Sequence, residues 1–196
     1  MTVIADTTNR SRKAAILVAA QPVFLRHGYR KTSMDDVARA ADVSRQGLYV
    51  HFESKEQLFR EMIDQGLSLR LHEARLILSD EARPIGQRLI DALNAWFGDR
   101  DKLSGNSDLL QASLQIGGTI IQDRKDQLEH EICRAIEKSE LMSVYAARCI
   151  SARDITNTLM ATSLGIDTTA SSEKFITRVS LAVRIFAAPC APASEI

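Results

Sequence analysis

Four consecutive polar or small residues, Ser44-Arg45-Gln46-Gly47, stand directly before the apolar Leu48. At the start of a helix, Ser44 would cap the first turn, and Arg45 and Gln46 would direct their donors outward. Arginine can donate two hydrogen bonds to guanine and glutamine can pair with adenine, each worth about 1–3 kcal/mol of discrimination. Gly47 costs a helix about 1 kcal/mol relative to alanine, so we interpret it as allowing close approach to another molecule. This segment therefore predicts recognition of base edges in the major groove of DNA.

Two short helices joined by a tight turn would position this segment. The first is predicted from Thr32, which can cap it with Asp35 in the capping-box position, to Ala41. The turn follows at Asp42, and the second helix is predicted to end at Phe52. This arrangement is typical of a helix-turn-helix. The residues predicted to face inward are Val37, Ala38, Ala41, Leu48 and Phe52.

The rest of the sequence also has the helical period, and no stretch alternates like a strand. Apolar residues recur every three or four positions from Ile16 to a predicted helix stop at Gly28, and Pro22 predicts a kink or a weakened helix between them. Gly117 and Gly118 predict a break or a bend in a later helix. The predicted fold class is therefore all-α.

The other predicted helices cover residues 55–79, the segment from Pro84 onward, 108–116, 120–148 as one helix or two, 152–166 and 172–188. Ser54 with Gln57 and Ser151 with Asp154 are predicted capping boxes. The apolar face predicted for the helix from Pro84 is Ile85, Leu89, Ala92, Leu93 and Trp96.

The charge of the chain is balanced overall but divided unevenly along its length. The 196 residues carry 25 basic and 25 acidic side chains. Residues 1–60 have a net charge of +4, and residues 61–196 have a net charge of −4. Such asymmetry favours a nucleic-acid partner for the N-terminal segment. No apolar run is long enough to cross a membrane and no signal-peptide pattern is present, so we expect a cytoplasmic protein.

Recognisable catalytic and metal-binding patterns are missing from the sequence. It has no nucleophile elbow, zinc-protease, phosphate-loop or dinucleotide-binding motif, so we expect neither an enzyme nor a bound cofactor. Asp35 and Asp36 suit helix caps rather than metal ligands, because no His or Cys lies nearby at metal spacing. The three cysteines are too few for a disulfide framework. Cys133 and Cys149 leave a thiol switch open, although small buried apolar residues are the favoured interpretation.

The run from Gly28 to Phe59, GYRKTSMDDVARAADVSRQGLYVHFESKEQLF, closely resembles the N-terminal DNA-binding region of the TetR/AcrR family of bacterial repressors. The resemblance covers residues 12–60 and departs from the family at Pro22 and at Gln46, where a small residue is common. With it we expect four segments along the chain. They are a disordered arm over 1–11, a helix-turn-helix DNA-binding domain over 12–57, a helical ligand-binding and dimerisation domain over 58–188 and a disordered tail over 189–196.

The resemblance implies a set of residues that contact DNA. Arg45 and Gln46 match positions that meet base edges, and Tyr49 and His51 match positions that contact phosphates. A helix N-terminus at Thr32 and Ser33 would also bind phosphate, and Lys55 would lie near the DNA backbone. The full predicted set is Thr32, Ser33, Ser44, Arg45, Gln46, Gly47, Tyr49, His51 and Lys55. The basic residues predicted to form either an arm that reaches DNA or a solvated tail are Arg10, Arg12 and Lys13.

The resemblance further implies double-stranded operator DNA, a second copy of the chain and a small, largely apolar effector as partners. The last two predicted helices are apolar on more than one face, which predicts a dimer interface and a palindromic operator. The predicted interface residues are Ile155, Leu159, Ile166, Ile176, Val179, Val183 and Phe186. The predicted pocket residues are Leu93, Trp96, Phe97, Gln111, Gln115 and Ile132, each of which can also be plain core packing.

The leading hypothesis is a ligand-responsive repressor that is released from its operator by the effector. A thiol-based redox regulator that uses Cys133 or Cys149 is an alternative of the same broad class. An enzyme on a helical scaffold is an alternative of another class, opposed by the missing motifs. A sequence-independent DNA binder is opposed by the −4 charge of residues 61–196, because non-specific affinity depends mostly on neutralising phosphates.

Overall fold

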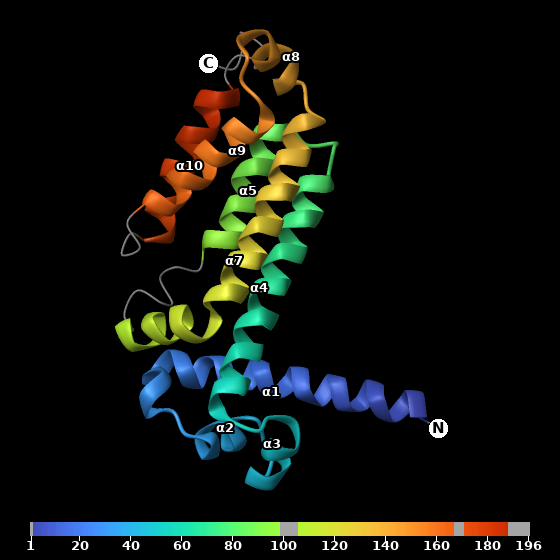
Figure 1. The fold of residues 1–196 in the computed structure, drawn as a ribbon, viewed down its shortest axis with the longest axis vertical. Coiled ribbons are helices and arrows are strands. Elements are labelled where there is room, and N and C mark those ends of the chain that lie inside the picture. The colour runs from blue at the N-terminus through green and yellow to red at the C-terminus, as the bar shows by residue number, and fades with distance from the viewer. Residues whose placement is uncertain (1, 99–105, 167–170, 188–196) are drawn as a thin grey trace. The chain divides into compact units, whose positions relative to one another are not determined.

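A computed structural model describes residues 2–98, 106–166 and 171–187, and every regular element in these ranges is a helix (Figure 1). The predicted all-α fold class is confirmed. Within the same ranges, no helix is both long and apolar enough to cross a membrane. The elements are α1 (Thr2–Lys31), α2 (Met34–Ala40), α3 (Arg45–His51), α4 (Lys55–Ser79), α5 (Ile85–Phe97), α7 (Ser107–Glu137), α8 (Leu141–Tyr145), the 3-10 helix η2 (Ala146–Arg148), α9 (Ala152–Gly165) and α10 (Ser172–Ala187).

The internal contacts divide the chain into two compact units. The first unit comprises Met1–Ser68 and Gly105–Gln122, and the second comprises Leu69–Ser104 and Asp123–Ile196. α4 and α7 each contribute to both units, so the division falls inside helices rather than in a linker. The first unit therefore contains the start of α7 in addition to the predicted helix-turn-helix segment.

An aromatic cluster forms the centre of the first unit. Phe24 and Phe59 are fully buried with their ring centroids 4.9 Å apart, and the Tyr29 centroid lies 4.9 Å from that of Phe59. Ile16 and Ala20 continue the buried face of α1, as their spacing predicts. Burying one such large side chain contributes about 1.5–3 kcal/mol, so this cluster fixes α1 against the start of α4.

Helix α1 continues through Pro22 and departs from helical geometry at Gly28 instead. The predicted kink at Pro22 is wrong. Pro22 has no backbone N–H, so the carbonyl of Val18, four residues earlier, lacks its helical hydrogen bond. Both residues are exposed, so water can supply a replacement bond. Gly28 has a φ of 79°, which confirms the predicted stop, although its ψ of 172° lies outside the left-handed helical region. A Cβ at Gly28 would also lie 2.7 Å from Oδ2 of Asp108.

The N-terminal end of α1 differs from the prediction as well. The helix begins at Thr2, where the sequence predicted a disordered arm over 1–11. Lys13, predicted as part of an arm or tail, packs within the first unit: its Nζ lies 2.7 Å from Oε2 of Glu61 and 5.1 Å from the Phe52 ring centroid. The predicted tail over 189–196 lies outside the described residues.

Ser33, rather than the predicted Thr32, caps α2. The Ser33 hydroxyl accepts from the Asp36 N–H at 3.1 Å, and the Asp36 carboxylate accepts from the Ser33 N–H at 3.0 Å. The Ser33 side chain, followed by its backbone, holds the pKa of Asp36 below its ordinary value. Thr32 is buried, and its hydroxyl donates to the carbonyl of Gly28 at 2.7 Å. The capping box therefore lies one residue later than predicted.

The next two helices begin at the serines that the sequence predicts. The Ser44 hydroxyl accepts from the N–H of Gly47 at 3.0 Å and caps α3. The Ser54 hydroxyl accepts from the N–H of Gln57 at 3.1 Å and caps α4. The Gln57 side chain returns a bond, but to the N–H of Glu53 at 2.8 Å rather than to the cap residue. These caps fix where α3 and α4 begin after the turns that precede them.

Helix α7 continues through Gly117 and Gly118, so the predicted break there is wrong. A Cβ at Gly117 would lie 2.8 Å from Cδ1 of Ile63, whereas a Cβ at Gly118 would meet nothing within 4 Å. Gly117 thus allows α4 and α7 to pack closely within the first unit. The glycine pair marks a helix contact rather than a helix end.

The second unit is built around the predicted apolar face of α5. α10 packs against both α5 and α9 (Figure 1), and the rings of Phe97 and Phe175 lie 5.7 Å apart. α9 begins at the predicted capping box of Ser151 and Asp154. The buried residues on the α5 face include all five predicted ones, which are Ile85, Leu89, Ala92, Leu93 and Trp96.

Candidate nucleic-acid interface

The outward face of α3 carries Arg45, Gln46, Tyr49 and Val50, which the helical period brings to one side. All four are exposed, and Val50 is 77% exposed. Leu48 on the opposite side is fully buried, so it anchors the helix with this face outward. The face offers long hydrogen-bond donors beside one exposed apolar side chain, which is a combination that base edges can match.

Arg45 is held in position by two neighbours. Its Nη1 donates to Oδ2 of Asp35 at 3.1 Å, and its guanidinium carbon lies 5.9 Å from the Tyr49 ring centroid. Arg45 and Asp35 are both exposed, so their ion pair contributes at most about 1 kcal/mol. A base edge could replace Asp35 at small cost. The sequence predicted Asp35 only as a helix cap and missed this pairing.

Gly47 and His51 have packing roles within the chain. A Cβ at Gly47 would lie 3.1 Å from the capping hydroxyl of Ser44, so the glycine prevents crowding at the cap. The predicted close approach to another molecule is not needed to explain it. His51 is half-buried, with its ring centroid 6.4 Å from that of Phe52. Both residues remain next to the exposed face of α3.

The side chains of Thr32 and Lys55 bind the backbone of their own chain. This corrects the predicted place of the Lys55 ammonium near the DNA backbone, whereas the phosphate contact predicted at Thr32 uses backbone N–H groups and stays a prediction. The Thr32 hydroxyl is buried against the carbonyl of Gly28. Lys55 Nζ donates to the carbonyls of Tyr29 at 2.9 Å, Thr32 at 3.0 Å and Arg30 at 3.4 Å, and it lies 4.5 Å from the Tyr29 ring centroid. An ammonium group has three donors, so these carbonyls occupy all of them. Lys55 therefore ties the end of α1 to the start of α4.

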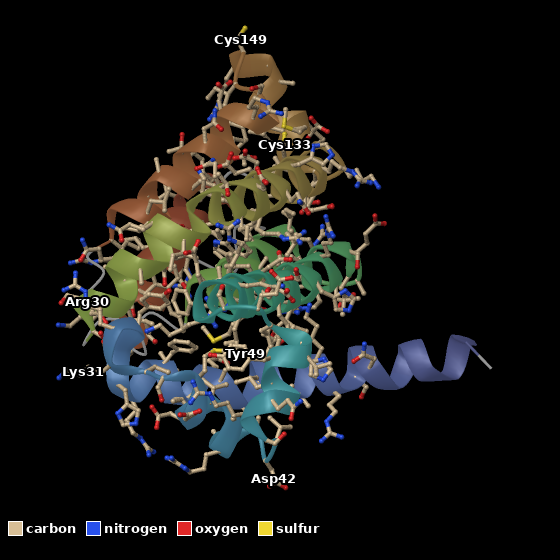
Figure 2. All side chains as sticks on the ribbon, turned by 60° about the horizontal axis from the view of Figure 1, so that its bottom comes forward. Arg30, Lys31, Asp42, Tyr49, Cys133 and Cys149 are labelled. Carbon is tan, nitrogen blue, oxygen red and sulfur yellow. The ribbon has the colours of Figure 1, made fainter. Side chains whose placement is uncertain are left out.

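Other basic residues near α2 were missed by the sequence reasoning. Figure 2 shows Arg30 and Lys31 at the end of α1. Arg30 is engaged with Asp108, which accepts from its N–H at 2.9 Å and lies 3.3 Å from its Nε. Lys31 is exposed and has no side-chain partner among the described residues. The sequence signal for Lys31 was its position two residues before the Ser33 cap. The signal for the exposed Val50 was its outward position on the second predicted helix.

The predicted pocket residues are divided between the two units. Four are buried in the core of the second unit, and two are exposed on the part of α7 that belongs to the first unit. Buried side chains that fill a core leave little surface for a ligand, so the apolar pocket stays a prediction. The buried four are Leu93, Trp96, Phe97 and Ile132, and the exposed two are Gln111 and Gln115.

Most residues predicted for a dimer interface face the interior of the second unit. Ile176 is exposed, and Phe186 is half-buried, with its carbonyl accepting from the Tyr145 hydroxyl at 2.7 Å. The other five are buried, because they supply the contacts between the last two helices and the rest of the unit. This corrects their predicted role. The five are Ile155, Leu159, Ile166, Val179 and Val183.

A different set of residues forms the exposed apolar face of α9 and α10. Leu181 and Ile185 are 61% and 64% exposed, and Leu164 is also exposed. An open groove of about 470 Å³ runs between the two helices, with Leu181 and Ile185 on one side and Thr162 on the other. Contiguous exposed apolar surface of this kind typically marks a site for another molecule.

Cys133 and Cys149 do not form a reactive pair. Cys133 is buried, and its thiol donates to Oε1 of Glu137 at 3.5 Å. Burial, followed by this hydrogen bond, raises the pKa of the Cys133 thiol and so lowers its thiolate fraction. Cys149 is exposed with a φ of 57°, and its sulfur points outward (Figure 2). The structure does not favour the thiol switch, and Cys190 lies outside the described residues.

Similarity to known proteins covers the segment that carries α3. The family model described as bacterial regulatory proteins, tetR family, matches residues 16–62. The uncharacterized HTH-type transcriptional regulator YfiR of Bacillus subtilis is 46% identical over 56 residues, 29% of this chain and 27% of the relative. A probable acrEF/envCD operon repressor of Escherichia coli K12 is 53% identical over 47 residues, 24% of this chain and 21% of the relative. The chain thus matches about a quarter of the length of these curated relatives.

Broader similarity extends beyond the helix-turn-helix. The regulator YhgD of Bacillus subtilis is 29% identical over 126 residues, 64% of this chain and 65% of the relative. A crystal structure assigned to the TetR family, from Mesorhizobium loti MAFF303099, superposes with a TM-score of 0.72 at 20% identity and covers 92% of this chain and 97% of that one. At this identity the likeness shows the fold alone. These relatives are named as regulators rather than enzymes, as the sequence predicts. Residues 16–62 of the chain are thus similar to the tetR family of bacterial regulatory proteins.

Proposed function

We propose that this chain is a transcriptional regulator that binds double-stranded operator DNA through α2 and α3. The observation that carries the proposal is the outward face of α3, where Arg45, Gln46 and Tyr49 stand on a helix anchored by the buried Leu48. A helix with donors at its N-terminal end suits the major groove. The net charge of +4 on residues 1–60 supports attraction to phosphates. Binding to chromosomal DNA would place the protein in the cytoplasm.

Within this proposal, the residues of α3 divide between bases and phosphates. Arg45 recognises guanine and Gln46 recognises adenine at the edge of the major groove. Tyr49 and His51 contact phosphates on either side. Lys31 contacts the DNA backbone in place of Lys55, because the Lys31 side chain is exposed and has no side-chain partner among the described residues.

The test of DNA recognition starts with selection of bound genomic fragments at moderate salt, followed by fluorescence anisotropy on the selected duplex. Arg45→Ala should weaken operator binding by about 1–3 kcal/mol and relax specificity at one base pair. Binding to a scrambled duplex should change little. Arg153→Ala, which removes an exposed arginine of α9, is the matched control. Equal losses on operator and scrambled duplex would refute base recognition by Arg45.

We further infer that the regulator acts as a homodimer in which a second copy covers Leu181 and Ile185. These residues lie one turn apart on α10 and are among the most exposed large apolar side chains of the second unit. Burying each would contribute about 1.5–3 kcal/mol. A two-fold dimer would present two α3 helices and therefore require a palindromic operator.

Sedimentation equilibrium tests the dimer. The double variant Leu181→Glu, Ile185→Glu should sediment as a folded monomer, since four glutamates would meet across the interface of a dimer. Leu76→Glu is the control, because Leu76 is 58% exposed on α4 of the same unit. A wild-type chain that sediments as a monomer would rule out the dimer.

The proposed regulatory response is repression that ends when a small effector binds the second unit. The name of the Escherichia coli relative, an operon repressor, supports repression over activation. The effector class expected from the family is small and largely apolar. It can release DNA only if it binds the released state more tightly than the DNA-bound state. A reporter driven by the selected operator distinguishes the two directions, because deleting a repressor raises expression and deleting an activator lowers it.

A further inference from the structure

An open pocket of about 300 Å³ lies within the second unit, where the last turn of α4 meets α5 and the end of α7. None of the residues predicted for an effector pocket lines it. Its walls are mostly charged and polar rather than apolar. The basic residues that line it are Arg75, Arg88, Arg134 and Lys138.

Arg88 places a buried positive charge in the wall of this pocket. The residue is only 7% exposed, and its Nη1 donates to the carbonyl of Leu78 at 2.9 Å. Its Nε is enclosed and has no hydrogen-bond partner in the part of the chain that the structure describes. Over the same ranges Arg88 has no ion pair. Since a buried cation is destabilising without a counter-ion, this side chain favours an anion in the pocket.

The acidic residues at the pocket do not supply that counter-ion. Glu131 is shared between Arg75, at 3.0 Å, and Arg134, at 3.4 Å. The other two acidic lining residues, Glu81 and Glu140, are exposed to solvent. Lys138 is exposed and has no side-chain partner among the described residues. Arg88 and Lys138 are therefore the two cations left for a ligand.

We propose that this pocket binds a small organic anion, with a carboxylate group held by Arg88 and Lys138. A guanidinium presents its donors in a planar fork that matches a carboxylate. The pocket volume lies at the lower end of the range for ligand sites, which suits a ligand of a few carbon atoms. This anion site is separate from the largely apolar effector of the proposed function, and binding to it can be measured without DNA.

A purely structural role for Arg88 makes a different prediction. Its bond to Leu78 lies in the last turn of α4, where a cation is favoured by the helix dipole. If this bond were the whole role, removing Arg88 would lower the melting temperature without changing the response to any anion. The two roles therefore differ in ligand binding and not in stability alone.

The test is isothermal titration calorimetry on the full chain at constant ionic strength. The probes are succinate, acetate and inorganic phosphate, with succinamide as the uncharged counterpart of succinate. We expect saturable binding of succinate, none of succinamide, and affinity reduced about tenfold or more in Arg88→Met. Lys138→Gln should weaken succinate several-fold. Arg148→Gln, in η2 and outside the pocket, should leave binding unchanged.

The proposal would be overturned if neither succinate nor acetate bound saturably, or if succinate and succinamide bound equally. It would also be overturned if Arg88→Met and Lys138→Gln both left succinate binding unchanged. Saturable binding of phosphate alone would overturn the carboxylate assignment. If Arg88→Met does not fold, Lys138→Gln decides the result, because its side chain is exposed. A chain that binds succinate but no operator would refute the proposed function and leave the pocket in place.

Discussion

Replacing Lys55 by methionine removes a set of hydrogen bonds and leaves the unbranched stem of the side chain in place. The ammonium donates to the carbonyls of Tyr29 at 2.9 Å and Thr32 at 3.0 Å, with a longer bond to Arg30. Each of the two shorter bonds, being charge-assisted, is worth about 1.5–3 kcal/mol. Because the site is half-buried, solvent screens part of this sum, and we take about half of it. The free energy of unfolding should therefore fall by about 1.5–3 kcal/mol.

Urea unfolding followed by circular dichroism measures this loss. Lys31→Met is the matched control, since Lys31 is exposed without a side-chain partner among the described residues, and it should change stability by less than about 0.5 kcal/mol. The salt dependence of operator binding gives a second, independent measurement. A lost phosphate contact reduces the slope of log K against log salt by about 0.9, and Lys55→Met should leave this slope unchanged.

One combination of results would refute the reasoning about Lys55. An unfolding free energy within about 0.5 kcal/mol of the wild type, together with a reduced salt slope, would show that the ammonium faces DNA phosphates rather than its own backbone. The Lys31→Met control should show the opposite pattern, with unchanged stability and a reduced slope.

Three further substitutions test the backbone and the caps. Gly117→Ala should melt at a lower temperature than Gly118→Ala, because both gain the helix propensity of alanine but only the Cβ at 117 would meet a neighbour, Cδ1 of Ile63 at 2.8 Å; equal melting temperatures would contradict this packing role. Gly28→Ala should cost about 1–3 kcal/mol at a φ of 79°, and unchanged urea unfolding would argue against strain there. Ser33→Ala should raise the pKa of Asp36 toward its ordinary value of 3.8, measured by NMR titration. Because the folded pKa of Asp36 is lowered, the stabilisation by its ionised form is complete well above pH 3.8 and is lost as the pH falls through the folded pKa. A pKa unchanged in Ser33→Ala would contradict the capping role.

Local sequence signals located the helix starts but not always the capping residue. Thr32 and Ser33 both have an aspartate three residues later, so the sequence offers two overlapping capping boxes. The structure selects Ser33, because Thr32 is buried against the carbonyl of Gly28. Burial is a tertiary property that the local pattern does not contain. Ser44 and Ser54 had no such competitor, and both were predicted correctly.

The partners of charged residues that turn inward could not be predicted from the sequence either. Lys55 was expected at DNA, but the end of α1 offers carbonyls that only the folded chain brings within its reach. Arg88 had a visible signal, since it interrupts the apolar face of α5 between Ile85 and Leu89. Periodicity places such a residue on the buried side but does not say whether its partner is a carbonyl, a carboxylate or a ligand.

The last two helices show why apolar residues alone did not identify the exposed face. In α10 the buried Phe175, Val179 and Val183 recur every four residues and face α5 and α9. Leu181 is two positions after Val179, a rotation of about 200°, so it lies on the opposite side of the helix with Ile185 one turn further on. Composition marks both sides as apolar, and only packing shows which one the chain covers by itself. In the proposed dimer, a two-fold partner would bury this uncovered side on both copies at once.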